Sequence, residues 1–158
     1  MGGFSSYYAR AVANHFFRGD VESSVQSRPS ELFLSLHSAA PTDVGSSADE
    51  LTGGAYVRQS IAFDEPDTDL YSPATPSATP TSGEVVYLSF ISNNSDIIFP
   101  ALPASEISHI GIWTDKYAGR LVFSDIIVNS ENQSTDLFIL NNGDSFVAPQ
   151  GSIKIYIQ

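Results

Sequence analysis

The chain has 158 residues, of which 42% are hydrophobic, and its seven Lys and Arg against 18 Asp and Glu give a formal net charge of −11. A chain of this length is expected to fold as one domain, and its charge repels phosphate backbones and anionic membranes, which excludes nucleic-acid binding. The lack of cysteine excludes disulfides and thiolate metal sites, and no apolar run approaches the roughly 18 residues of a membrane-spanning helix, so no membrane insertion is expected.

Residues 1–19 are expected to form an N-terminal α-helix packed on or beside the domain. Phe4, Tyr8, Val12 and Phe16 recur at i, i+4 spacing, and Gly19 stands where a helix commonly ends. Two roles are open for this helix: it packs on the chain's own sheet, or it docks on a neighbouring protein. Its four apolar residues are therefore candidate interface residues.

Two strands are expected in the first part of the chain, ELFLSLH at 31–37 and AYVRQSIAF at 55–63, with a loop between them. The pair Gly53-Gly54 in that loop is followed neither by Gly-Lys-Ser/Thr nor by a helix. It is therefore expected to be a turn feeding a strand rather than a phosphate-binding loop. Arg58 is expected to pair with a carboxylate or an aromatic ring.

Residues 64–83, DEPDTDLYSPATPSATPTSG, are expected to form an exposed Pro/Ser/Thr-rich loop, because proline lacks the N–H donor that a sheet ladder needs. The segment also contains the densest acidic cluster, Asp64, Glu65, Asp67 and Asp69. The cluster lacks the spacing of an EF-hand, so a solvated acidic loop is expected, with a weak surface calcium site as the alternative.

The second half of the chain is almost entirely strand-like, with turn residues between the apolar runs. The expected strands are 84–91, 95–100, 107–114, 120–128, 134–140 and 151–158. Closely spaced strands without intervening helices favour an antiparallel β-sandwich of roughly eight strands. The sequence thus predicts a mainly β fold, with one sandwich domain over residues 20–158 and a single N-terminal helix.

A search for catalytic residues finds no enzyme signature. The histidines His15, His37 and His109 lack the spacing of a helical zinc pair, and no serine lies in a Gly-x-Ser-x-Gly turn. Two catalytic carboxylates cannot be singled out among the acidic residues. We therefore expect no enzymatic activity, no metal site and no cofactor.

Trp113 and Tyr117 are the remaining candidate interface residues. With Tyr71 and Tyr87 they are candidate stacking platforms for a sugar ring, whereas Trp113 is equally explained as an anchor in the core or in a protein interface. These two interpretations stay open at the level of the sequence.

Three segments in order resemble a family of small tailed-bacteriophage virion proteins labelled phage tail-fibre-like. They are FLSLHSAAPTDVGSSADELTGGAYVRQSIAF (33–63), IIFPALPASEISHIGIWTDKYAGRLVF (97–123) and NNGDSFVAPQGSIKIYI (141–157). The opening helix, with its HFF-x-G ending, is also similar to the family. The chain departs from the family's pattern in the 64–83 segment and in the polar turn WTDKYAGR at 113–120, which are candidate recognition or packing surfaces.

The resemblance implies a non-enzymatic structural component of the virion, assembled in the cytoplasm of the bacterial host. A tail-associated role, as a fibre or tail-accessory protein, is favoured over a capsid decoration (cement) protein. A glycan-binding host-recognition module is the alternative from another functional class. The expected partners are further copies of the chain in a homo-oligomer and other virion proteins, with host surface glycans in the alternative.

Overall fold

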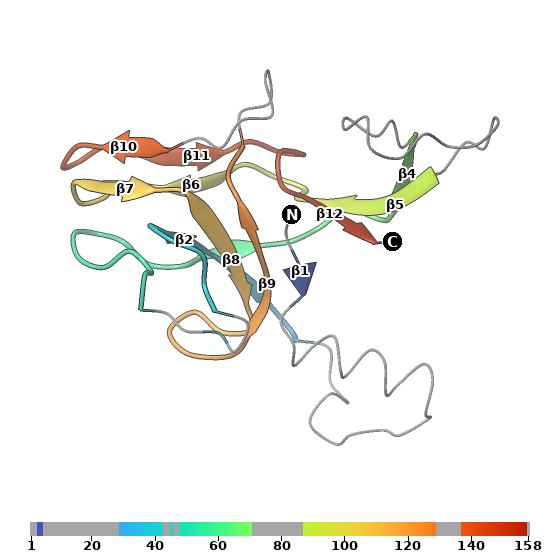
Figure 1. The fold of residues 1–158 in the computed structure, drawn as a ribbon, viewed down its shortest axis with the longest axis horizontal. Helices are drawn as coiled ribbons and strands as arrows, with labels where there is room; N and C mark the ends of the chain where they lie inside the picture. Colours follow the sequence, from blue (N-terminus) through green and yellow to red (C-terminus); the bar gives the residue numbers. More distant parts are fainter. Residues whose placement is uncertain are drawn as a thin grey trace. The chain divides into compact units, whose positions relative to one another are not determined.

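The computed structural model describes residues 3–4, 29–42, 45, 48–70, 87–128 and 137–157, and these form antiparallel β-structure without a helix. The strands are β1 (Gly3–Phe4), β2 (Leu32–His37), β3 (Gln59–Ile61), β4 (Asp67–Leu70), β5 (Tyr87–Ser92), β6 (Ile97–Phe99), β7 (Ser105–Ile107), β8 (His109–Trp113), β9 (Leu121–Ile126), β10 (Phe138–Leu140), β11 (Phe146–Ala148) and β12 (Lys154–Ile157) (Figure 1). The prediction of a mainly β, antiparallel fold is confirmed. The strands fall in two compact units.

The first unit is built on a five-stranded sheet in the order β1-β9-β8-β2-β3. β2 lies in the middle, where Leu34 opposes Ile112 of β8 and Leu36 opposes Ile110. Leu34, Leu36 and Ile112 are buried, as the apolar alternation of LFLSLH requires. Both faces of β2 are covered, because Ser35 and His37 on the opposite face are also completely buried. This second buried face is polar, and the candidate site lies there.

Short strand pairs complete the first unit, with β7 paired to β10 and β6 paired to β11. Aromatic rings connect these pairs: Phe99 contacts Phe146, which meets Phe138 edge-on at 5.5 Å between ring centroids. Phe99 also stacks on Tyr56, at 5.9 Å. Aromatic packing therefore takes the place of a long hydrogen-bonded ladder in this region.

The second unit is a three-stranded sheet in the order β12-β5-β4, held by the side chain of the buried Asn93. Its amide nitrogen donates to the carbonyls of Ser95 (2.9 Å) and Pro149 (2.8 Å). Its amide oxygen accepts from the backbone N–H of Ile153 (2.8 Å). One side chain thus satisfies three backbone groups that no strand ladder pairs, and it ties the end of β5 to the turn that precedes β12.

Two predicted elements differ from the structure. Phe4, expected in the N-terminal helix, lies in β1 and pairs with Phe123 at the edge of the five-stranded sheet. β4 lies inside the expected 64–83 loop and pairs with β5. It begins directly after Pro66 and is an edge strand, which are the positions where a sheet tolerates proline. Residues 5–19, with Tyr8, Val12 and Phe16, and residues 71–83 lie outside the described residues.

The expected strand 55–63 is shorter than predicted, since only β3 (Gln59–Ile61) pairs regularly with β2. The residues before it are held by side-chain contacts instead of a ladder. β7 and β11 were not predicted, because three-residue strands next to prolines give little periodic signal. The single sandwich domain over 20–158 stays a prediction. No helix within the described residues is long and apolar enough to cross a membrane.

Replacing Asn93 by alanine is expected to lower the free energy of unfolding by about 2 kcal/mol, because a buried side chain loses three hydrogen bonds and the Ile153 N–H loses its acceptor in a buried position, whereas the Pro149 carbonyl keeps the Ser152 N–H and hydroxyl as donors. Asn94→Ala is the matched control, since the neighbouring asparagine is exposed, and it is expected to change stability by less than about 0.5 kcal/mol. Urea unfolding of the three proteins measures both values. Equal stabilities of the two variants would contradict the role of Asn93.

Candidate functional site

The centre of the polar face of β2 is a buried ion pair between Arg58 and Glu50. Arg58 donates through Nε to Oε1 of Glu50 (2.7 Å) and through Nη2 to Oε2 (2.6 Å), a bidentate arrangement. The two side chains are only 5% and 10% exposed. Glu50 is placed there because it forms an antiparallel bridge with His37 at the end of β2, next to the Leu51 N–H bond to the Leu36 carbonyl.

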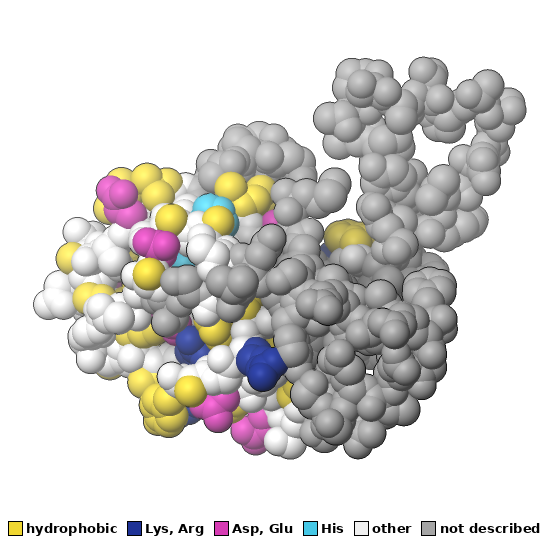
Figure 2. Space-filling view, turned by 60° about the horizontal axis from the view of Figure 1, so that its bottom comes forward, with side chains coloured by type: hydrophobic (Ala, Val, Ile, Leu, Met, Phe, Trp, Pro, Cys, Tyr) yellow, Lys and Arg dark blue, Asp and Glu magenta, His cyan; other side chains and the backbone are white. Residues whose placement is uncertain are grey.

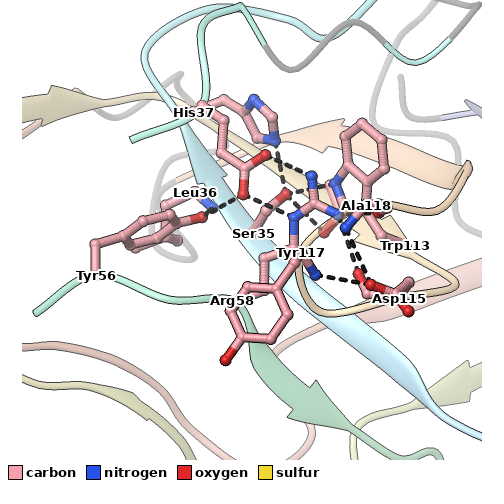
Figure 3. A network of polar contacts seen from close by, with 11 residues as sticks. Ser35, Leu36, His37, Tyr56, Arg58, Trp113, Asp115, Tyr117 and Ala118 are labelled. Carbon is pink, nitrogen blue, oxygen red and sulfur yellow. Dashed lines mark hydrogen bonds and ion pairs between the residues drawn. The ribbon is translucent and has the colours of Figure 1, made fainter. Parts of the chain in front are cut away.

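Arg58 also binds the turn between β8 and β9. Its Nη1 donates to the carbonyls of Asp115 (3.0 Å) and Ala118 (2.7 Å), and its guanidinium lies over the Trp113 ring at 3.9 Å from the centroid (Figure 3). The prediction that Arg58 pairs with a carboxylate or an aromatic ring is confirmed, and it does both. A planar guanidinium suits this position because it can donate in several directions while stacking on a ring.

Tyr56 extends the same network toward β2. Its hydroxyl donates to Oε1 of Glu50 (3.0 Å) and accepts the N–H of Leu36 (3.1 Å). Burial has the largest effect on the pKa of the Tyr56 hydroxyl and raises it. The hydrogen bond from the Leu36 N–H lowers this pKa, and the Glu50 carboxylate raises it further. The hydroxyl therefore stays protonated and serves as a bridge between the ion pair and the strand.

Gly53 and Gly54 form the turn that brings Tyr56 and Arg58 back to Glu50. Both have positive φ, 94° and 58°, and the Tyr56 N–H donates to the Gly53 carbonyl. A Cβ on Gly54 would approach the Ala101 carbonyl oxygen to 3.2 Å. The expectation of a turn is confirmed, and the glycine pair serves the geometry of the ion pair.

A second buried group, Ser35, His37 and Trp113, lies beside the ion pair. The Trp113 indole N–H donates to Oγ of Ser35 (2.8 Å), and Oγ donates to the Gly111 carbonyl (3.1 Å). Oγ is also 2.6 Å from Nε2 of His37. Because the serine hydrogen is used by Gly111, we assign the His37 proton to Nε2, which leaves Nδ1 as a buried acceptor without a partner.

This Ser–His pair lacks the features of a nucleophile and its base. Both side chains are fully buried, so a substrate carbonyl cannot reach the serine oxygen. No carboxylate orients the imidazole through Nδ1, which a catalytic triad requires. Gly111 is needed because a Cβ there would lie 2.8 Å from both Ser35 Oγ and Trp113 Nε1. The arrangement packs and orients strands and offers no chemistry to a ligand.

The turn that Arg58 binds, residues 114–120, is ordered by its own hydrogen bonds. Oδ1 of Asp115 accepts the N–H groups of Tyr117 (2.9 Å) and Ala118 (3.0 Å), which lowers the pKa of that carboxyl. Thr114 and Arg120 close the turn, through a backbone bond of 3.1 Å and an N–H bond to Oγ1 of Thr114 of 3.0 Å. Tyr117 lies in the middle of this turn, and its side chain is 78% exposed.

Comparison with protein families gives one match that spans almost the whole chain. Residues 3–156 match the family model described as podophage GP4 fiber I protein gp80. The chain belongs to this family of phage fibre proteins. It is therefore a tail-associated structural component of a bacteriophage virion and not an enzyme, as predicted. A search of curated proteins gave no match.

The fibre family also decides between two of the predicted roles. A tail-associated fibre protein agrees with the favoured prediction, and the capsid decoration role gains no support from the family match. The resemblance found in the 33–63 and 97–123 segments is thereby confirmed. In this fibre protein those two segments supply both sides of the buried network, because Glu50, Tyr56 and Arg58 come from the first and Trp113 and the turn from the second.

The predicted interface residues have different surroundings in the fibre protein. Trp113 is 2% exposed and belongs to the core, so its ring is not a surface platform for a sugar. Tyr117 is on the surface, Tyr71 lies outside the described residues, and nothing is described of the Tyr87 side chain. The described part of the acidic 64–83 segment is exposed at Asp64 to Asp67. No group of three or more potential metal ligands occurs among the described residues.

Glu50 is the important residue that the sequence analysis did not identify. Its position gives a signal, since it lies eight residues before Arg58 across a Gly-Gly turn, and such a turn brings its two flanks together. The signal is weak because the chain contains 18 carboxylates. Asp49, the residue before Glu50, is almost as close in sequence to the same turn.

Replacing Arg58 by methionine is expected to cost about 3–5 kcal/mol, because it leaves the Glu50 carboxylate buried without a counter-charge. The double variant Glu50→Gln, Arg58→Met is expected to be more stable than Arg58→Met alone, since it removes both charges. Denaturant unfolding measures these values. Lys116→Met, which removes a cation from the neighbouring turn, is the control and is expected to stay within about 0.5 kcal/mol of the parent.

Acid is expected to destabilise the protein through His37. Burial lowers its pKa from 6.5 to about 4, with Arg58 adding to the effect and Glu50 opposing it. In the unfolded chain His37 therefore binds a proton near pH 6.5, whereas in the folded protein it stays neutral at that pH. The contribution of neutral His37 to the free energy of unfolding is complete above pH 6.5. It is lost as the pH falls toward 4, and the loss amounts to roughly 3 kcal/mol.

The control for this prediction is His37→Gln, which keeps an N–H donor near Ser35 but does not titrate. Unfolding free energies measured between pH 7 and pH 4 are expected to fall more steeply for the parent than for this variant. Carboxylates titrate in both proteins and cancel in the difference. Parallel curves for the two proteins would show that His37 is not protonated on unfolding.

Proposed function

We propose that this fibre protein works as a homo-oligomeric subunit of the tail that also packs against other virion proteins. The observation that supports self-association is a set of exposed, uncharged strand residues in the first unit. Ile98, Val147 and Ile139 all point outward from short strands, and Ile139 is 71% exposed. An aliphatic side chain that is so exposed gains free energy when a partner covers it.

Charge supports the same proposal. A chain with a net charge of −11 repels its own copies at long range, so two copies can approach closely only through surfaces that contain few carboxylates. The strands β6, β10 and β11 have the sequences IIF, FIL and FVA and contain no charged residue. The described face in Figure 2 shows hydrophobic side chains in separate groups among uncharged polar atoms, with acidic side chains at several places between them and few basic ones.

In the proposed subunit, residues 20–158 make one β-sandwich domain. The segment after β1, up to residue 19, supplies the N-terminal helix, whose apolar side chains Tyr8, Val12 and Phe16 provide a docking surface for a neighbouring protein. The i, i+4 spacing of these residues supports this part of the proposal. The 64–83 segment, exposed at its described beginning, is a further packing surface.

Binding of host surface glycans is the second candidate function, and one observation favours it. Tyr117 presents an exposed ring on an ordered turn, which suits stacking against a sugar. The other described candidate, Trp113, is buried and offers no such surface. A single ring gives a weaker platform than the paired rings expected from the sequence, so self-association is the favoured function.

Light scattering coupled to size exclusion is expected to give a molar mass that is a multiple of the chain mass and that rises with concentration toward a limiting value. The physical reason is burial of the exposed strand residues between copies. Counting the protein in purified virions gives an independent check, with a small copy number expected for a tail component. A strict monomer at all concentrations would contradict the homo-oligomer.

A further inference from the structure

Tyr117 and Ile139 are the two most exposed of the large hydrophobic side chains in the described part of the chain, at 78% and 71%. Each lies beside a charged residue, and the two charges have opposite signs. Lys116 places its ammonium 5.6 Å from the Tyr117 ring centroid, and Glu106 is directly opposite Ile139 in the β7–β10 pair. Both surfaces are therefore apolar, and their charges are complementary.

The Tyr117 surface is preorganised. Arg58 binds the carbonyls on both sides of the turn tip, and Asp115 accepts the N–H groups of Tyr117 and Ala118. Gly119, with φ of 80°, has no room for a Cβ, which would lie 2.7 Å from the Cβ of Asp115. Because the backbone is already ordered, a partner that binds Tyr117 does not have to order it. Such rigidity favours a contact residue over a merely solvated side chain.

The Ile139 surface lies on the outer face of the β7–β10 pair. Residues opposite each other in an antiparallel pair point to the same face, so Glu106 and Ile139 do so together. Leu137, directly before β10 and two residues before Ile139, is exposed as well. Phe138 points the other way, toward Phe146. Glu106 forms no ion pair with any residue that the structure describes, nor does Lys116.

We propose that Tyr117 and Lys116 of one copy dock on the surface formed by Glu106, Leu137 and Ile139 of a second copy. The Tyr117 ring covers the two aliphatic side chains, and the Lys116 ammonium pairs with the Glu106 carboxylate. This assignment rests on the homo-oligomer proposed above and names its interface. The occupant is a second copy because the same chain supplies both members of the complementary pair.

The two surfaces cannot meet within one copy. They belong to the same compact unit, and Figure 1 shows the β8–β9 turn at the lower end of β8 and β9, whereas β7 and β10 lie at the opposite end. Two arrangements satisfy this pairing: a two-fold dimer, in which the turn of each copy lies on the β7–β10 face of the other, and a heterologous contact, in which each copy uses its turn on one neighbour and its β7–β10 face on another. Repetition of such a contact gives a ring where the rotation closes, or a filament where it does not.

Sedimentation velocity of full-length charge-reversal variants tests this interface. Lys116→Glu and Glu106→Lys are each expected to weaken association several-fold, because each places like charges in contact. The double variant Lys116→Glu, Glu106→Lys restores the opposite charges and is expected to associate within about twofold of the parent. Glu31→Lys, an exposed substitution with the same charge change as Glu106→Lys, is the control and is expected to leave association unchanged.

Tyr117 supplies the second arm of the experiment. Tyr117→Ala is expected to weaken association about tenfold or more, whereas Tyr117→Phe keeps the ring and is expected to stay within about twofold. The side chain is on the surface, so at protein concentrations low enough for the parent to be monomeric both variants are expected to unfold at the same denaturant concentration as the parent, which separates loss of contact from loss of fold.

Four outcomes would overturn the assignment. If the parent associates but the single reversals or Tyr117→Ala leave association unchanged, the interface lies elsewhere and the homo-oligomer itself stands. If the double variant stays as weak as the single ones, Lys116 and Glu106 are not partners. If Tyr117→Ala abolishes binding to immobilised host glycans but not self-association, the turn binds sugar. A strictly monomeric parent would instead remove the homo-oligomer.

Discussion

The buried pair of Arg58 and Glu50 is the interaction on which the first unit depends. A charge placed in a protein interior is costly unless its partners satisfy it completely. Here the guanidinium makes two bonds to the carboxylate and two to backbone carbonyls, and it also stacks on an indole ring. Those contacts connect two segments that are far apart in sequence, 50–58 and 113–118. A hydrophobic contact could not take the place of this ion pair, because an aliphatic side chain cannot donate hydrogen bonds to the carbonyl oxygens of Asp115 and Ala118.

The same constraint explains residues that are otherwise difficult to account for. Gly53 and Gly54 reverse the chain so that Arg58 returns to Glu50, and their positive φ angles explain why glycine occurs twice in succession. Gly111 lies in the middle of a strand, a position that glycine weakens, because the Ser35 hydroxyl and the indole N–H occupy the space of a Cβ. The polar interior thus restricts the sequence at positions that are neither charged nor part of a ligand site.

Much of the fold follows from the sequence, and the exceptions have physical causes. The alternation at 31–37 predicts β2 well because one face of that strand is continuously apolar. It does not reveal that the polar face is buried too, since the partners of Ser35 come from β8, 76 and 78 residues further along. The class of partner for Arg58 was predictable from chemistry, but its identity depends on which carboxylate a turn brings back. Short strands such as β7 depend on their neighbours and leave no periodicity of their own.

Burial separates the structural role of this site from an enzymatic one. Ser35 and His37 stand 2.6 Å apart and an arginine lies nearby, a combination of residue types that also occurs in hydrolases. In an enzyme such groups line a cleft, whereas here the side chains are buried. Their hydrogen bonds go to backbone carbonyls and to other side chains of the network. What the network presents to the outside is a rigid turn that ends in an exposed aromatic ring. A polar interior that binds the backbone of a surface turn keeps that turn in one shape without any ligand.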